Sequence, residues 1–154
     1  GGQDCPNGLD RLSVQASWFS QPQTAGWEIP NQAVAGAPSY AEECLRVQVR
    51  PGGPDFNGIE ELMARRTDIA LVEGADVAQA IDSGVGLTVV GNYFQRSALN
   101  LLSLNKSETL QNLQGKNVGV WCCGFDIPVK MMLKAAGVDV NYVPQSYSLN
   151  QLYE

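Results

Sequence analysis

The sequence predicts an α/β fold built on parallel β-sheet. Short apolar segments alternate with segments of helical spacing, and brief loops rich in glycine and proline separate them. This alternation is typical of a parallel sheet whose faces are covered by the connecting helices. Because the pattern restarts late in the chain, we expect a first lobe over residues 1–97, a crossover or hinge over 98–107 and a second, partial lobe over 108–154.

Four strands are expected in the first lobe, because four short segments are apolar or alternate apolar and polar residues. They cover residues 11–19, 45–49, 68–72 and 87–92. Helical spacing predicts helices between them, over residues 24–40, 55–66 and 75–82. Pro30 interrupts the first of these helices, and Asp55 is the expected N-cap of the second.

The second lobe is expected to repeat the pattern and to be incomplete. After a further strand over 98–104 in the crossover, the predicted order is helix 108–113, strand 117–121, helix 127–136 and strand 140–143. Ser107 is a candidate helix cap, and residues 148–154 have the pattern of a capped helix that is just starting. Because two strands cannot cover their own core, we expect the N-terminal half of a longer protein, with a self-sufficient domain as the alternative.

The composition describes an acidic globular protein. The chain has 154 residues, of which 44% are hydrophobic and 17% charged, and this is enough apolar material for a core. A net charge of -6 argues against nucleic acid, which requires a basic surface. No segment approaches the ~20 apolar residues of a membrane span, and no signal peptide opens the chain. The polar start, residues 1–4, is compatible with a chain that follows a lipidated cysteine and equally with residues left by cloning.

The cysteines indicate a disulfide but not a metal site. Cys5 precedes the first predicted strand and Cys44 the second, and these entry points lie side by side in a parallel sheet. A Cys5–Cys44 disulfide would indicate an oxidising compartment, whereas two separate buried thiols are the alternative. The chain has no histidine and no Cys-x₂-Cys spacing, so we expect no metal and no cofactor.

Three segments resemble a known family. FQRS at 94–97 and LQNLQGKNVGVW at 110–121, with RPGGPD at 50–55, are similar to solute-binding proteins of ABC importers for thiamine-pyrimidine precursors, riboflavin and related heterocycles. The same family includes the fungal enzymes that make the thiamine pyrimidine. The resemblance implies a type II periplasmic-binding-protein-like fold and hinge closure over the ligand. It also implies an ABC permease as the partner, a monomeric state, and a place in the periplasm or on the outer face of the cell.

The expected ligand contacts lie where the strands end, because loops at the carboxyl ends of parallel strands meet at one edge. Aromatic side chains would hold a flat ring, and free N–H groups at a helix start would bind polar groups. The candidates are Trp18, Thr24, Trp27, Gly53, Glu73, Tyr93, Gln95, Trp121, Gly124, Phe125 and Asp126. The alternatives are core packing for the two first-lobe tryptophans, a solvated loop acid for Glu73 and a helix cap for Asp126.

Nothing in the sequence indicates catalysis. There is no histidine base, no Gly-x-Ser-x-Gly elbow and no phosphate-binding Gly-x-x-x-x-Gly-Lys. Cys122 and Cys123 are interpreted as thiols that line the cleft without redox work. We therefore expect a binding protein and not an enzyme. An enzyme like the pyrimidine synthases, or an accessory subunit that reuses this lobe, are the alternatives.

Overall fold

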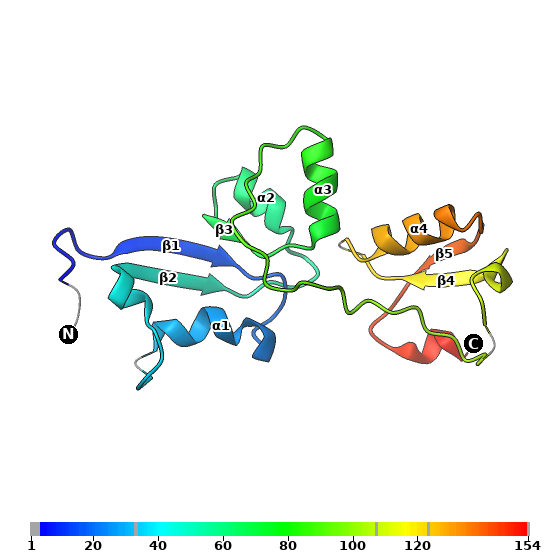
Figure 1. Cartoon of the computed structure of the whole chain (residues 1–154), viewed down its shortest axis with the longest axis horizontal. Coiled ribbons are helices and arrows are strands. Elements are labelled where there is room, and N and C mark those ends of the chain that lie inside the picture. Colours follow the sequence, from blue (N-terminus) through cyan, green and yellow to red (C-terminus); the bar gives the residue numbers. More distant parts are fainter. Residues whose placement is uncertain (1–3, 33, 107, 123, 154) are drawn as a thin grey trace. The chain divides into compact units, whose positions relative to one another are not determined.

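The computed structural model describes residues 4–32, 34–106, 108–122 and 124–153, and it is an α/β protein with two small parallel sheets (Figure 1). The chain divides into two compact units, Gly1–Val72 and Glu73–Glu154. The division lies directly after the third strand, whereas the sequence predicted a first lobe that ends at residue 97. The helix at 74–82 therefore groups with the second unit.

The first unit is built on a parallel sheet with the strand order β2-β1-β3. The strands are β1 (Asp10–Gln15), β2 (Leu45–Arg50) and β3 (Ile69–Ala70). Figure 1 shows β1 and β2 side by side and pointing the same way. Val14 and Ala16 are 1% and 2% exposed, so the apolar alternation of the first strand does form a buried face.

Short helical turns replace the long helix predicted over 24–40. They are η1 (Pro22–Thr24), α1 (Ala25–Glu28), η2 (Ile29–Asn31) and η3 (Tyr40–Glu43). Pro30 lies inside η2, and a proline removes the backbone donor that a continuous helix needs at that point. The break predicted at Pro30 is thus present, but the helical turns on either side are shorter than expected.

Asn57, not Asp55, caps the helix α2 (Gly58–Met63), so the predicted cap was wrong. The Asn57 side-chain oxygen accepts hydrogen bonds from the N–H groups of Ile59 and Glu60 at 3.0 and 3.3 Å. Asp55 lies two residues too early, in the turn that precedes the helix, where its carboxylate cannot serve the first helical N–H groups.

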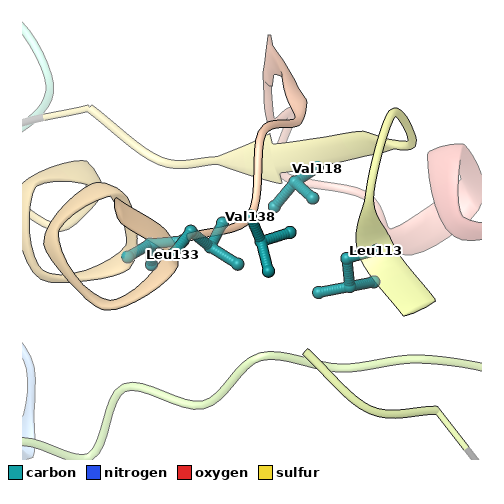
Figure 2. Close-up of a cluster of buried hydrophobic side chains, with 5 residues drawn as sticks. Leu113, Val118, Leu133 and Val138 are labelled. Carbon is teal, nitrogen blue, oxygen red and sulfur yellow. The ribbon is translucent and has the colours of Figure 1, made fainter. Parts of the chain in front are cut away.

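The second unit contains a two-stranded parallel sheet and its own core. Its elements are α3 (Gly74–Asp82), η4 (Gln111–Leu113), β4 (Asn117–Val120), α4 (Asp126–Ala135), β5 (Asn141–Pro144) and η5 (Leu149–Leu152). In Figure 2, side chains from η4, β4, α4 and the turn after α4 point toward one another. The buried cluster consists of Leu113, Val118, Val129, Leu133 and Val138. Among the residues described, no helix has the length and apolar character to cross a bilayer.

The strands predicted at 87–92 and 98–104 are absent. Residues 85–105 form neither strand nor helix, and Figure 1 draws this segment as coil. Val89 and Val90 are 64% and 79% exposed, and β3 pairs with β1 alone. An apolar sequence becomes a strand only when a neighbouring strand completes its ladder of hydrogen bonds, and here none does.

Candidate ligand-binding site

Two loops meet at the carboxyl edge of the first sheet. One follows β1 and the other follows β2. The N–H of Ala16 donates to the carbonyl of Arg50 at 2.9 Å, and the N–H of Gly52 donates to the carbonyl of Trp18 at 2.8 Å. The sequence predicted that these two loops converge, and backbone hydrogen bonds hold them together.

Glycine is required where these loops touch. A Cβ atom on Gly52 would lie 2.1 Å from the carbonyl oxygen of Ala16, which no side chain can tolerate. A Cβ atom on Gly53, whose φ is +154°, would lie 3.0 Å from the ring of Phe19. Both glycines are buried. Because they have no side chain, the Ala16 carbonyl and the Phe19 ring can approach the loop closely.

An aromatic pair forms the exposed side of this edge. The rings of Trp18 and Phe19 meet edge to face, with centroids 5.6 Å apart and planes at 74°. Phe19 is 56% exposed and Trp18 is half-buried. Phe19 was missing from the predicted contacts, although it lies beside Trp18 in the same loop. Ring surface next to fixed backbone groups suits a flat aromatic ligand.

Gln15 is a second residue that the sequence analysis missed. It is the last residue of β1 and only 2% exposed. Its side-chain nitrogen Nε2 donates to the carbonyls of Ala16 and Pro51, at 3.1 Å each. A glutamine between two apolar residues at the end of a strand was the only available signal. We call Gln15, Trp18, Phe19, Gly52 and Gly53 the aromatic edge.

Thr24 and Trp27 lie in the turns that follow this edge. The Thr24 hydroxyl is buried, within 2.9 Å of the Gln21 carbonyl oxygen and 3.1 Å of Glu28 Oε1. The Trp27 carbonyl accepts a hydrogen bond from the Tyr40 hydroxyl at 3.0 Å. Thr24 is therefore bonded within its own turn, and the predicted ligand contacts of both residues stay predictions.

The second sheet also has an aromatic pair at its carboxyl edge. Trp121 follows β4 and Tyr147 lies three residues after β5. Their ring centroids are 4.9 Å apart with an interplanar angle of 66°. Tyr147 is 73% exposed, so this pair also offers ring surface to solvent.

A carboxylate lies directly against the turn between β4 and α4. Gly124 is buried with φ +87°, and a Cβ atom there would lie 2.6 Å from Oδ2 of Asp76, in the first turn of α3. Asp126 starts α4 and its carboxylate pairs with Lys130 at 2.5 Å. A helix cap was the alternative interpretation of Asp126, but Phe125 occupies the N-cap position and no side chain caps this helix. The lysine one turn ahead attracts the Asp126 carboxylate instead. The predicted ligand contact of Asp126 stays a prediction.

Two acids near this turn have raised pKa values, and the charge of a third contributes to one of these shifts. Burial raises the pKa of Asp76, and the charge of Asp126 raises it further. Glu73 is exposed as a residue, yet partial burial of its carboxylate raises its pKa, with a second contribution from Asp76. We call Glu73, Asp76 and Asp126 the carboxylate cluster. Such a cluster disfavours phosphates and favours ligands that are neutral or carry amino groups.

Two further predicted contacts, Tyr93 and Gln95, lie outside the helices and strands. Tyr93 stacks on Phe94 with centroids 4.3 Å apart, and both, like Gln95, are exposed in the coil after α3. Cys123 lies outside the described residues, as does Ser107. Within the described part of the chain, no group of three His, Cys, Asp or Glu side chains is arranged to hold a metal ion.

A disulfide joins Cys5 to Cys44, with Cα atoms 5.6 Å apart. Cys44 comes just before β2, and its carbonyl accepts a hydrogen bond from the N–H of Asp10 at the start of β1. The disulfide is the pair that the sequence suggested. It fixes the amino ends of the two strands, at the opposite edge of the sheet from the aromatic edge.

One family comparison covers most of this structure. The sequence model of the family described as NMT1/THI5 like matches residues 39–150, which is 112 of the 154 residues. Comparisons with curated proteins and with solved structures give no match. The matched region contains the two glycines of the aromatic edge and all of the second sheet. Since the match covers well over half of the sequence, the chain belongs to the NMT1/THI5-like family.

Proposed function

We propose that this chain is the N-terminal half of a type II solute-binding protein of an ABC importer, and that it captures a small aromatic heterocycle. Membership of the NMT1/THI5-like family suggests a binding-protein-like function. The observation that carries the proposal is the aromatic edge, where ring surface lies beside a glycine loop at the carboxyl ends of parallel strands. Open α/β sheets hold their ligands at this edge.

The aromatic edge supports stacking as the main source of affinity. Phe19 packs over Gly53, and its ring is in edge-to-face contact with Trp18, so the two rings have little freedom to lose on binding. A flat heterocycle would stack on the exposed ring surface, and closure of the second lobe would exclude water. Only the closed form would then be presented to the permease.

The charge of the second unit supports a ligand without phosphate. The carboxylate cluster would repel a phosphorylated molecule and would accept hydrogen bonds from ring amines or hydroxyl groups. A thiamine-pyrimidine precursor, which carries an amino group, is therefore our first choice of ligand, and riboflavin our second. This reasoning uses binding groups alone, and the proposal assigns the chain no reaction and no cofactor.

The apolar side chains exposed in the coil at 85–105 support the proposal that the protein is longer than this chain. Large hydrophobic residues of this coil are between 39% and 79% exposed: Val89, Val90, Tyr93, Phe94, Leu99, Leu101, Leu102 and Leu104. So much apolar surface in one stretch is unusual for a complete soluble domain. We propose that the C-terminal half of the protein covers it.

The disulfide supports a location outside the cytoplasm. Disulfides persist in oxidising compartments such as the periplasm and the cell exterior. We therefore propose a monomeric protein of the periplasm or the outer cell face, anchored by lipid if a modified cysteine precedes the first residue. Its partners would be the small ligand and the ABC permease, with no role for nucleic acid.

Calorimetric titration of the full-length protein with the hydroxymethyl aminopyrimidine precursor of thiamine, and with riboflavin, tests the proposal. We expect saturable binding of one of them, weakened about tenfold by Trp18→Ala because a stacking surface is lost. Tyr153→Ala is the control, since Tyr153 is 74% exposed and lies after η5. No binding of either compound, or equal loss in both variants, would contradict it.

A further inference from the structure

We infer that Gln15 is a positioning residue, whose side-chain amide holds the two loops of the aromatic edge at a fixed separation. The expected effect on ligand affinity rests on the proposed function. The bridge between the two loops follows from the contacts of Gln15 alone.

The amide of Gln15 bridges the ends of two strands. Its Nε2 lies 3.1 Å from the carbonyl oxygen of Ala16, which follows β1, and 3.1 Å from that of Pro51, which follows β2. An amide nitrogen carries two hydrogens and so can donate to both carbonyls. The reversed amide would place an oxygen against two oxygens, so these partners determine its orientation.

The backbone of Gln15 extends the bridge to the third strand. Its carbonyl accepts a hydrogen bond at 2.9 Å from the N–H of Leu71, one residue after β3. Gln15 therefore contacts the chain at the end of every strand in this sheet. No other type of side chain of this length offers two donors without a charge.

The bridge matters because it supports the contact between Gly52 and Ala16, where the two loops are in close backbone contact. Gly52 lies so close to Ala16 that a single added carbon would overlap the Ala16 carbonyl. The hydrogen bond from Gly52 to the Trp18 carbonyl joins this contact to the ring that we expect to bind the ligand. If Gln15 no longer held the carbonyls of Ala16 and Pro51, the loops could separate, and the orientation of Trp18 relative to Gly53 would change.

Gln15→Met tests the inference, because methionine has nearly the same length and no donor. Gln48→Met is the matched control, since Gln48 lies on the neighbouring strand β2 with its side chain exposed. For the fluorescence measurement alone, both are made with Trp27→Phe and Trp121→Phe, so that Trp18 is the only tryptophan. Affinity is measured without these two substitutions, because Trp27 and Trp121 are candidate ligand contacts. The readouts are acrylamide quenching of Trp18 fluorescence and the dissociation constant for the hydroxymethyl aminopyrimidine, with circular dichroism to show folding.

We expect Gln15→Met to increase quenching of Trp18 and to weaken binding about tenfold, while Gln48→Met changes neither. Unchanged quenching and affinity in a folded Gln15→Met protein would overturn the inference. Increased quenching in a protein that binds no heterocycle, with or without the substitution, would support the bridge and count against the proposed function.

A measurement on the wild-type chain covers the case in which Gln15→Met does not fold. In amide NMR spectra, we expect both side-chain protons of Gln15 to exchange slowly with water, because both are donated to carbonyls inside the fold. The side-chain protons of Gln48 serve as the exposed reference. Equally fast exchange of the two side chains would overturn the inference.

Discussion

The two parallel sheets end in similar aromatic pairs, but their edges are held in different ways. In the first unit, the loops are joined by backbone hydrogen bonds and by the uncharged amide of Gln15. In the second unit, the turn beside Trp121 is packed against the carboxylate of Asp76. The first edge is thus held by uncharged hydrogen bonds, whereas the turn of the second lies against a carboxylate whose pKa is raised.

The acids of the two units show the same contrast. Asp68, just before β3, accepts hydrogen bonds from the backbone N–H and the hydroxyl of Ser13, at 2.7 and 2.8 Å, and these bonds lower its pKa. Asp76 has its pKa raised by burial and by Asp126. Hydrogen bonds thus stabilise the Asp68 carboxylate in the first unit, whereas burial and a like charge oppose ionisation of Asp76 in the second.

The largest expected effect comes from removing the disulfide. Cys5 and Cys44 are 39 residues apart in sequence. On a chain-entropy estimate, closing a loop of that length stabilises by about 4 kcal/mol. In a Cys5→Ser, Cys44→Ser variant, we expect hydrogen exchange to accelerate throughout the first unit. The second unit is the internal control, and equal acceleration in both units would show that they are not energetically separate.

Gly52→Ala should damage the aromatic edge almost as much. The new methyl group would meet the Ala16 carbonyl oxygen at 2.1 Å, and both partners are backbone, so we expect a loss of about 3 kcal/mol in unfolding free energy. Gly26→Ala is the control, because nothing lies within 4 Å of the added carbon. Denaturant unfolding measures both, and similar midpoints for the two variants would refute the close approach.

Gly124→Ala tests the packing of Asp76 in the second unit. Its φ of +87° already disfavours alanine, and the added carbon would overlap the carboxylate. Gly137→Ala has a similar φ, +68°, with nothing within 4 Å, so it isolates the backbone strain of about 1 kcal/mol. We expect Gly124→Ala to cost about 1 kcal/mol more than Gly137→Ala in thermal unfolding. The excess should fall when Asp76→Ala is combined with it, and an excess that persists would exclude Asp76 as its cause.

The smallest effects are expected when Asp76 or Asp68 is replaced by asparagine, and the two effects have opposite signs. A raised pKa means that the folded state binds the proton more tightly, so the contribution of Asp76 to stability decreases as pH rises. The pKa of Asp68 is lowered in the folded state, so its carboxylate stabilises the fold at pH values above the pKa of the unfolded state. That stability is lost as pH falls through the folded-state pKa. At pH 7, Asp76→Asn should raise the melting temperature by about 1–2 °C after allowance for solvent screening, and Asp68→Asn should lower it.

Thermal melts between about pH 4 and pH 7 would check these signs, since both aspartates have unfolded pKa values near ~4. The Asp76→Asn protein should show a flatter dependence than wild type. A melting temperature that falls in Asp76→Asn at pH 7 would mean that the carboxylate is stabilised by the start of α3 more than it is opposed by Asp126.

Local sequence patterns predicted the strands and helices that have a clear apolar period and a hydrogen-bonding partner nearby. β1, β2, β4, β5 and the helices α3 and α4 lie close to their predicted ranges, because each alternates or repeats with a clear period and has a partner nearby. The segments 87–92 and 98–104 have equally apolar sequences but form no strand. Their sequence cannot reveal whether a neighbouring strand exists, because pairing is a property of the whole sheet.

The meeting of the loops after β1 and β2 was predicted, but the side-chain contacts there were not. The loops that carry Trp18 and Gly53 meet at the sheet edge, as the topology of a parallel sheet requires. Phe19 and Gln15 were missed, since their roles depend on side-chain direction and burial at the end of β1. The contact between Asp76 and Gly124 joins residues nearly fifty positions apart, and no local pattern carries that information.

The most direct test of the central claim is an amide NMR titration of the full-length protein with the hydroxymethyl aminopyrimidine precursor of thiamine. If the aromatic edge holds the heterocycle, the largest shift changes within the first unit will fall on residues 16–19 and 51–54, where the loops after β1 and β2 meet. Changes concentrated near Asp10 and Leu45, at the opposite edge of the sheet, or no changes at saturating concentrations, would contradict the account.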